Sequence, residues 1–134
     1  MPDTEAFFDT NLLLYLLSKD AAKADRAEEL LANGGVVSIQ VLNEFAAVAS
    51  RKLGMSWGEI GEILLPIRAI CEIASVTLET HDRGIAIAER YGFSFYDAMI
   101  VASALGVGCK TLYSEDLQHG QVIARQLRIR NPFT

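Results

Sequence analysis

Short apolar runs alternate with longer helical stretches along the chain, and this alternation limits the fold more than any other feature. Each run is largely apolar and ends at polar or turn-forming residues, which is typical of a buried strand. The four predicted strands are residues 6–8, 36–39, 73–76 and 110–113. Strands that alternate with helices indicate a parallel sheet covered by helices on both faces. We therefore predict an α/β fold with a parallel sheet of four to five strands.

The predicted helices follow from apolar spacing and from the residues at their ends. They cover residues 12–17, 21–32, 41–53, 56–71, 80–91 and 94–107, and glycines end several of them. Ser56 and Glu59 have the spacing of a capping box at the start of the fourth helix. The tail, residues 127–130, is predicted to form an edge strand. Because the chain has 134 residues and no linker or repeat, one domain over residues 1–134 is expected.

Composition excludes several classes of protein. A net charge of -5 argues against a protein that coats duplex nucleic acid. Cys71 and Cys109 form no CxxC pair, so they are expected to be buried in the core of a protein from a reducing compartment. No basic segment follows Met1, and the apolar run 12–17 is too short to span a bilayer. We expect a cytoplasmic protein with no membrane partner.

Four acidic residues are predicted to lie at one edge of the sheet. Asp9 and Asp116 follow the first and fourth predicted strands. Glu44 lies early in the helix after the second strand, and Asp97 lies at the start of the helix from residue 94. Ligands of open parallel sheets bind at the carboxyl ends of the strands. Two carboxylates ~4 Å apart repel by about 4 kcal/mol at an effective dielectric of ~20, so a cation would be needed. Oxygen ligands favour Mg²⁺ or Mn²⁺.

Each of these acids also has a simpler interpretation. Asp9 stands between a strand and a helix, where an aspartate commonly serves as the helix N-cap. Asp97 is three residues after Ser94, which is the spacing of a capping box. Glu44 could be a solvated residue beside an apolar stripe, and residues 114–116 could form a turn. The shared location of the four acids, rather than any single one, favours a metal site.

Four segments carry a resemblance to a known family. They are Phe8-Asp9-Thr10-Asn11, Glu44 on the helix after the second strand, residues 96–104 (YDAMIVASA) and residues 112–120 (LYSEDLQHG). This order resembles that of PIN domains, and the match runs from about Phe7 to Phe133. The closing Asn131-Pro132-Phe133 is similar to the VapC-like toxins of type II toxin–antitoxin pairs.

The resemblance implies a PIN-like fold and a metal-dependent endoribonuclease, a hydrolase that cleaves RNA phosphodiester bonds with metal-activated water. The implied catalytic and metal-binding acids are Asp9, Glu44, Asp97 and Asp116, with Glu44 acting directly or through water. Asn11 would orient Asp9, and Ser114 would help to hold water or phosphate. Many relatives carry a further acid shortly after the fourth, whereas this chain has His119 nearby, so the number of metal ions, one or two, stays open.

The same resemblance implies an RNA substrate, a VapB-like antitoxin and a homodimer. An apolar content of 51% and a mean hydropathy of +0.23 suggest that another chain covers some apolar surface. Leu53, Met55 and Trp57 could receive a helical segment of a partner, or they could pack internally. An arginine of the antitoxin could pair with the carboxylates. The arginines at 125, 128 and 130 could contact phosphates or form a solvated edge.

Alternative functions share parts of this pattern. A housekeeping RNA-processing PIN nuclease would have the same acids, and a catalytically silent PIN-fold binding module would share the fold. A receiver domain needs an acid pair after the first strand and an aspartate after the third, and both are missing here. A haloacid-dehalogenase-type phosphatase needs a second aspartate where Asn11 stands. The last two folds are therefore excluded.

Overall fold

The computed structural model describes residues 5–134. The sequence prediction about a basic segment after Met1 concerns residues outside this range. Within residues 5–134 the strands are β1 (Ala6–Phe8), β2 (Gly35–Ser38), β3 (Cys71–Ala74), β4 (Thr111–Tyr113), β5 (Val122–Ile123) and β6 (Leu127–Arg130). The helices are α1 (Thr10–Tyr15), α2 (Ala21–Ala32), α3 (Ile39–Leu53), α4 (Trp57–Ile70), α5 (Leu78–Tyr91) and α6 (Phe95–Gly106).

The strands form one mainly parallel sheet in the order β3-β2-β1-β4-β6-β5. β1 pairs in parallel with β2 on one side and with β4 on the other. β2 and β3 therefore lie on one side of β1, and β4, β6 and β5 lie on the other, so the strand order reverses at β1. In open α/β sheets, ligands bind in the crevice at the carboxyl ends of the strands at such a point.

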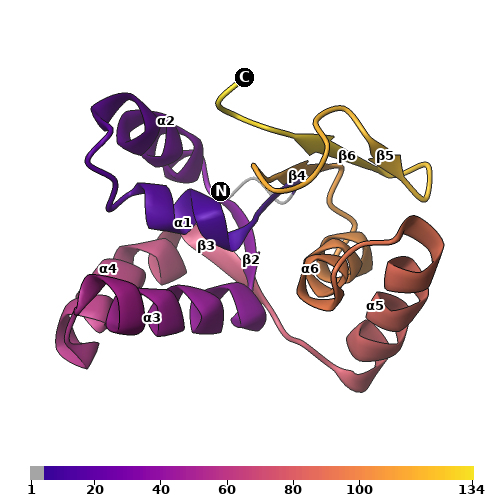
Figure 1. The fold of residues 1–134 in the computed structure, drawn as a ribbon, viewed down its shortest axis with the longest axis horizontal. Helices are drawn as coiled ribbons and strands as arrows, with labels where there is room; N and C mark the ends of the chain where they lie inside the picture. The colour runs from indigo at the N-terminus through magenta and orange to yellow at the C-terminus, as the bar shows by residue number, and fades with distance from the viewer. Residues whose placement is uncertain (1–4) are drawn as a thin grey trace.

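Two groups of helices flank this sheet (Figure 1). α1, α2, α3 and α4 pack together on the left of the view, while α5 packs against α6 on the right. α6 is apolar on every side, and its residues 98–104 are all buried, as expected for a helix enclosed by the core. The predicted α/β class with a parallel sheet between helices is confirmed, and this arrangement fixes the start of α6 beside the strand ends.

Two strands differ from the prediction. β3 begins at Cys71, two residues before the predicted 73–76, because Cys71 also caps the end of α4 and no turn separates helix from strand. β5 was not predicted, and it pairs with β6 in the antiparallel direction at the outer edge of the sheet. The prediction that residues 127–130 form the edge strand is therefore wrong, since β6 lies between β4 and β5.

Both cysteines are buried and unbridged, as the sequence predicted. Burial raises the pKa of the Cys71 thiol to about 11, which keeps this sulfur protonated and unreactive at neutral pH. Among the helices of residues 5–134, none combines the length and the apolar character needed to cross a membrane.

Candidate metal centre

Asp9 lies at the bottom of the candidate site, directly after β1. Its backbone N–H donates to the carbonyl of Tyr113 at 3.0 Å, which extends the β1–β4 pairing and fixes the residue beside the end of β4. The side chain is almost fully buried, with 3% of its surface exposed. One carboxylate oxygen accepts from the N–H of Thr10 at 2.6 Å, so the predicted helix-capping contact is present. A carboxylate has about four acceptor positions, so capping leaves room for a cation.

Asp97 and Asp116 complete an acidic cluster with Asp9. One carboxylate oxygen from each of the three residues lies within 4.8 Å of the others. Asp97 is half-buried in the first turn of α6, and Asp116 is exposed in the loop after β4. The cluster therefore runs from a buried floor to an open rim, from which a cation and a substrate could enter.

Electrostatics in this acidic cluster favour a bound cation. Burial raises the pKa of Asp9 to about 7, and the hydrogen bonds from Ser114 and Thr10 only partly offset it. Burial also raises the pKa of Asp97, and the negative charge of Asp116 adds to that rise. Within residues 5–134, no lysine or arginine forms an ion pair with these three acids. Three carboxylates without a counter-ion fit a hard divalent cation such as Mg²⁺ or Mn²⁺.

The capping interpretation of Asp97 is only half fulfilled. The side chain of Ser94 accepts from the backbone N–H of Asp97 at 3.3 Å, so Ser94 is the N-cap of α6. In the reciprocal capping box of α4, the Glu59 carboxylate returns a bond to Ser56. No such return bond from Asp97 occurs in the described part of the chain. Its carboxylate is therefore available to the acidic cluster.

Glu44 lies beside the acidic cluster rather than in it. One of its oxygens accepts from the Thr10 hydroxyl at 2.9 Å, and the other accepts from the Gln40 side-chain amide at 3.0 Å. Thr10 directly follows Asp9, so Glu44 is one hydrogen-bonded residue away from the buried acid. The structure therefore links Glu44 to the acidic cluster through Thr10.

The two predicted supporting residues differ in what they contact. Ser114 is fully buried, and its hydroxyl donates to the second carboxylate oxygen of Asp9 at 2.7 Å. The Ser114 oxygen also accepts from the N–H of Asp116 at 3.2 Å. Asn11 makes no bond to Asp9, because its buried side-chain oxygen and nitrogen have no hydrogen-bond partner among the described residues. Ser114, not Asn11, orients Asp9 in this structure.

A network of side chains next to Asp116 was missed by the sequence analysis. The Tyr15 hydroxyl donates to Glu115 at 2.6 Å, and this hydrogen bond raises the pKa of Tyr15. The Lys23 ammonium lies 3.5 Å from the other oxygen of Glu115. The ring of Phe133 meets the Tyr15 ring edge-on, with centroids 4.7 Å apart. We call these four residues the Tyr15 network. In the sequence, the only feature that indicated this network was the position of Glu115 directly before Asp116.

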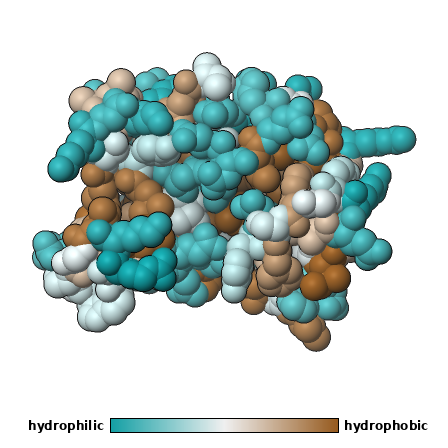
Figure 2. All heavy atoms as spheres, viewed as in Figure 1, coloured by the Kyte–Doolittle hydropathy of each residue, from teal (hydrophilic) through white to brown (hydrophobic). Residues whose placement is uncertain are grey.

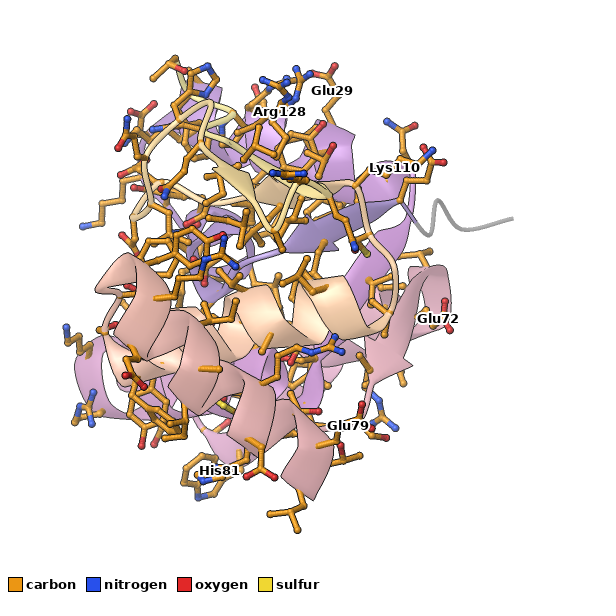
Figure 3. All side chains as sticks on the ribbon, turned by 90° about the vertical axis from the view of Figure 1, so that its right-hand side faces the viewer. Glu29, Glu72, Glu79, His81, Lys110 and Arg128 are labelled. Atoms are coloured by element: carbon orange, nitrogen blue, oxygen red, sulfur yellow. The ribbon has the colours of Figure 1, made fainter. Side chains whose placement is uncertain are left out.

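Histidines and arginines lie outside the acidic cluster. His81 is exposed on α5, at its outer side in Figure 3. The Nδ1 of His119 accepts from the N–H of Asn131 at 2.9 Å, which ties the loop after β4 to the C-terminal tail. The three arginines at 125, 128 and 130 are exposed, and Arg128 lies far from His81 in Figure 3.

Residues 6–123 match the family model for the PIN domain. The chain belongs to the PIN domain family. Its acidic cluster lies at the strand ends, at the place where the resemblance of the four segments led us to expect the PIN-domain acids. A comparison of this PIN domain with curated proteins finds no match.

Solved structures with a similar fold include a toxin–antitoxin complex, a VapC toxin and a VapBC complex. A toxin–antitoxin complex from Klebsiella pneumoniae superposes with a TM-score of 0.72 and 19% identity, covering 95% of this PIN domain and 97% of that chain. VapC20 of Mycobacterium tuberculosis, a sarcin–ricin loop cleaving toxin, has a TM-score of 0.67 and 21% identity over 81% and 88% of the chains. VapBC2 from Rickettsia felis, bound to a DNA fragment from its promoter, has a TM-score of 0.67 and 18% identity over 94% and 98%. These likenesses show a shared fold.

Proposed function

We propose that this PIN domain is a Mg²⁺- or Mn²⁺-dependent endoribonuclease and the toxin of a VapBC-type toxin–antitoxin pair, acting in the cytoplasm. The observation that carries the proposal is the convergence of Asp9, Asp97 and Asp116, with one oxygen of each within 4.8 Å of the others and no basic side chain paired to them among residues 5–134. The VapC and VapBC structures that share the fold support the toxin assignment.

Each acid has a part in the proposed reaction. Asp9, Asp97 and Asp116 would hold the cation directly, and Glu44 would hold it through water. When bound, a divalent cation activates water and neutralises charge that develops on a phosphoryl group. The Ser114 hydroxyl donates a hydrogen bond to Asp9, which would keep that carboxylate turned toward the acidic cluster.

The bond changes define the products. The water loses a proton and its oxygen forms a bond to phosphorus, while the bond from phosphorus to the 3′ oxygen breaks. The leaving oxygen takes up a proton, so the products end in a 5′-phosphate and a 3′-hydroxyl. The open rim at Asp116 leaves the scissile phosphate free to approach the acidic cluster from solvent.

We expect the purified protein to cleave single-stranded RNA in Mg²⁺ or Mn²⁺ and to lose this activity in EDTA. Restoring excess Mn²⁺ after EDTA should restore cleavage, because the acids themselves are unchanged by the chelator. Gel analysis of the fragments, with enzymes that require a 5′-phosphate, identifies the ends. Cleavage that persists in EDTA, or products that end in a cyclic 2′,3′-phosphate, would contradict the proposed reaction.

The surface also has features that suit a protein partner. A groove of about 480 Å³ lies between α1 and α3, and its apolar walls include Leu14, Leu17, Val48 and Leu53. Figure 2 shows hydrophobic side chains in a hollow on this side of the molecule. Trp57 is 70% exposed, so the alternative of internal packing is wrong for this residue. We propose that a helical segment of the antitoxin covers this groove. We also propose that an arginine of the antitoxin, outside that segment, pairs with the acidic cluster.

If a short reading frame lies directly upstream of the gene, a tagged copy of the chain co-expressed with it should bring down its product. Light scattering on the isolated chain should give about twice its mass of 14.7 kDa, as expected for a homodimer. A mass near 14.7 kDa at micromolar concentration would refute the dimer. If nothing co-purifies but metal-dependent cleavage remains, the chain is instead a housekeeping RNA-processing nuclease. If neither partner nor cleavage is found, it is a silent binding module.

A further inference from the structure

Asp116 depends on its neighbours for its position. Its carboxylate is exposed, and no hydrogen bond to that carboxylate occurs in the described part of the chain. Asp9, in contrast, is buried and accepts hydrogen bonds on both oxygens. The place of Asp116 in the acidic cluster therefore has to be fixed through the backbone of the loop after β4.

The two residues before Asp116 in that loop are both anchored. Ser114 precedes it, and its backbone N–H donates to the carbonyl of Arg130 at 3.0 Å while its side chain donates to Asp9. Glu115 directly precedes Asp116, and the Tyr15 hydroxyl donates to it at 2.6 Å. The Glu115 side chain is about a third exposed, so solvent screens only part of this contact.

Lys23 and Phe133 connect the rest of the Tyr15 network to α2 and the C-terminal tail. The Lys23 ammonium lies 3.5 Å from Glu115 and 4.7 Å from the centroid of the Tyr15 ring. It also lies 5.4 Å from the centroid of the Phe133 ring, so one cation contacts both aromatic residues and the carboxylate. Arg26 donates to the carbonyl of Pro132 at 3.3 Å, which holds the tail against α2. The network thus joins α1, α2, the loop after β4 and the tail.

We propose that Tyr15 and Lys23 are positioning residues, which hold Glu115 outside the acidic cluster and thereby hold Asp116 in reach of the cation shared with Asp9 and Asp97. This inference rests on the proposed function. α1 connects the two acids, because Asp9 caps the start of this helix and Tyr15 is its last residue. Tyr15 fixes the loop to the same helix that follows Asp9, so the buried and the exposed acid are held by one element.

The test compares Tyr15→Phe with Tyr91→Phe. Tyr15→Phe removes the hydroxyl that holds Glu115 and keeps the ring that packs on Phe133. Tyr91→Phe is the matched control, since its hydroxyl accepts from the N–H of Ala124 at 3.0 Å, outside the Tyr15 network. We expect Tyr15→Phe to weaken Mn²⁺ binding by on the order of tenfold, as residues that orient metal ligands commonly do. The kcat for RNA cleavage should fall by a similar factor with KM unchanged, and Tyr91→Phe should alter neither.

Three further variants cover the case in which Tyr15→Phe fails to fold. Lys23→Met should weaken Mn²⁺ binding in the same direction, and Lys23→Arg should restore it. Lys110→Met removes a surface ion pair with Glu5 of 3.2 Å (Lys110 is labelled in Figure 3) and should leave Mn²⁺ binding unchanged. Mn²⁺ binding is measured by calorimetry in the absence of RNA, which separates metal affinity from substrate affinity.

The outcomes separate this inference from the proposed function. If the unaltered protein binds Mn²⁺ and cleaves RNA, while Tyr15→Phe and Lys23→Met match it in both, the positioning role is refuted and the proposed function stands. If the unaltered protein binds no Mn²⁺ and cleaves no RNA, the proposed function fails, and the positioning role fails with it. A lower melting temperature of Tyr15→Phe with normal Mn²⁺ affinity would show a purely structural role and also overturn the inference.

Discussion

Replacement of Asp97 by asparagine should slow metal-dependent RNA cleavage by about a hundredfold or more, because a lost metal contact removes several kcal/mol of transition-state stabilisation. The amide of asparagine has nearly the shape of the carboxylate but no charge. Its backbone N–H still donates to Ser94, so the N-cap of α6 is retained. Because burial raises the pKa of Asp97, removing this charge should not lower the stability of the metal-free protein.

The Asp97 experiment needs a control for charge and for contaminating ribonuclease. Asp82→Asn makes the same chemical change at an exposed position of α5 and should cleave at the unaltered rate. Initial cleavage rates at saturating Mg²⁺, together with melting curves, distinguish lost chemistry from lost fold. Equal rates for Asp97→Asn and the unaltered protein would remove Asp97 from the site.

The stability of the metal-free protein should decrease as pH rises toward neutrality, and Asp9 should be a main cause. Burial raises the pKa of Asp9 from 3.8 to about 7, so the folded protein keeps a proton that the unfolded chain releases. The stabilisation is complete below pH 3.8, decreases as pH rises and is lost once pH passes about 7. The difference between the two pKa values corresponds to roughly 4 kcal/mol in the free energy of unfolding.

Urea denaturation in EDTA, in buffers that span the two pKa values of Asp9, 3.8 and about 7, measures this effect in the unaltered protein and in Asp9→Asn. The difference between the two proteins isolates Asp9, because the other titrating groups are common to both. Mn²⁺ should reverse the loss, adding about 2.7 kcal/mol at ~100 times its dissociation constant, or about 10 °C in melting temperature. Asp9→Asn should abolish this shift. A pH dependence that is identical in both proteins would show that Asp9 is ionised throughout.

Local signals in the sequence were sufficient for most helices. Ser56 and Glu59 form the predicted capping box, and Gly54 and Gly92 end α3 and α5. Such caps act within one turn, so they can be recognised from neighbouring residues alone. β5 could not be recognised in this way, because its two residues are a strand only through pairing with β6.

The site was predictable to the extent that it follows strand ends. Asp9 and Asp116 lie at the strand ends as predicted, since Asp9 directly follows β1, Asp116 lies in the loop after β4, and these two strands pair in parallel. Glu44 instead lies beside the acidic cluster, where it accepts a hydrogen bond from Thr10. These two residues are 34 positions apart in the chain, so the sequence pattern did not indicate this contact. The Tyr15 contact with Glu115 spans 100 residues, so no local pattern could indicate it. Long-range contacts of this kind are set by the packed fold.

The position of β1 has a consequence for protein synthesis. β1 lies at residues 6–8, and its partner β4 lies at residues 111–113, so the two halves of the acidic cluster leave the ribosome far apart in time. β4 also needs β6 as its other neighbour, at residues 127–130. Pairing between such distant segments has to wait for the whole intervening chain. Under the proposed function, the acidic cluster therefore stays incomplete until β4 and β6 have been synthesised and paired, so a nascent chain that lacks them should not cut RNA.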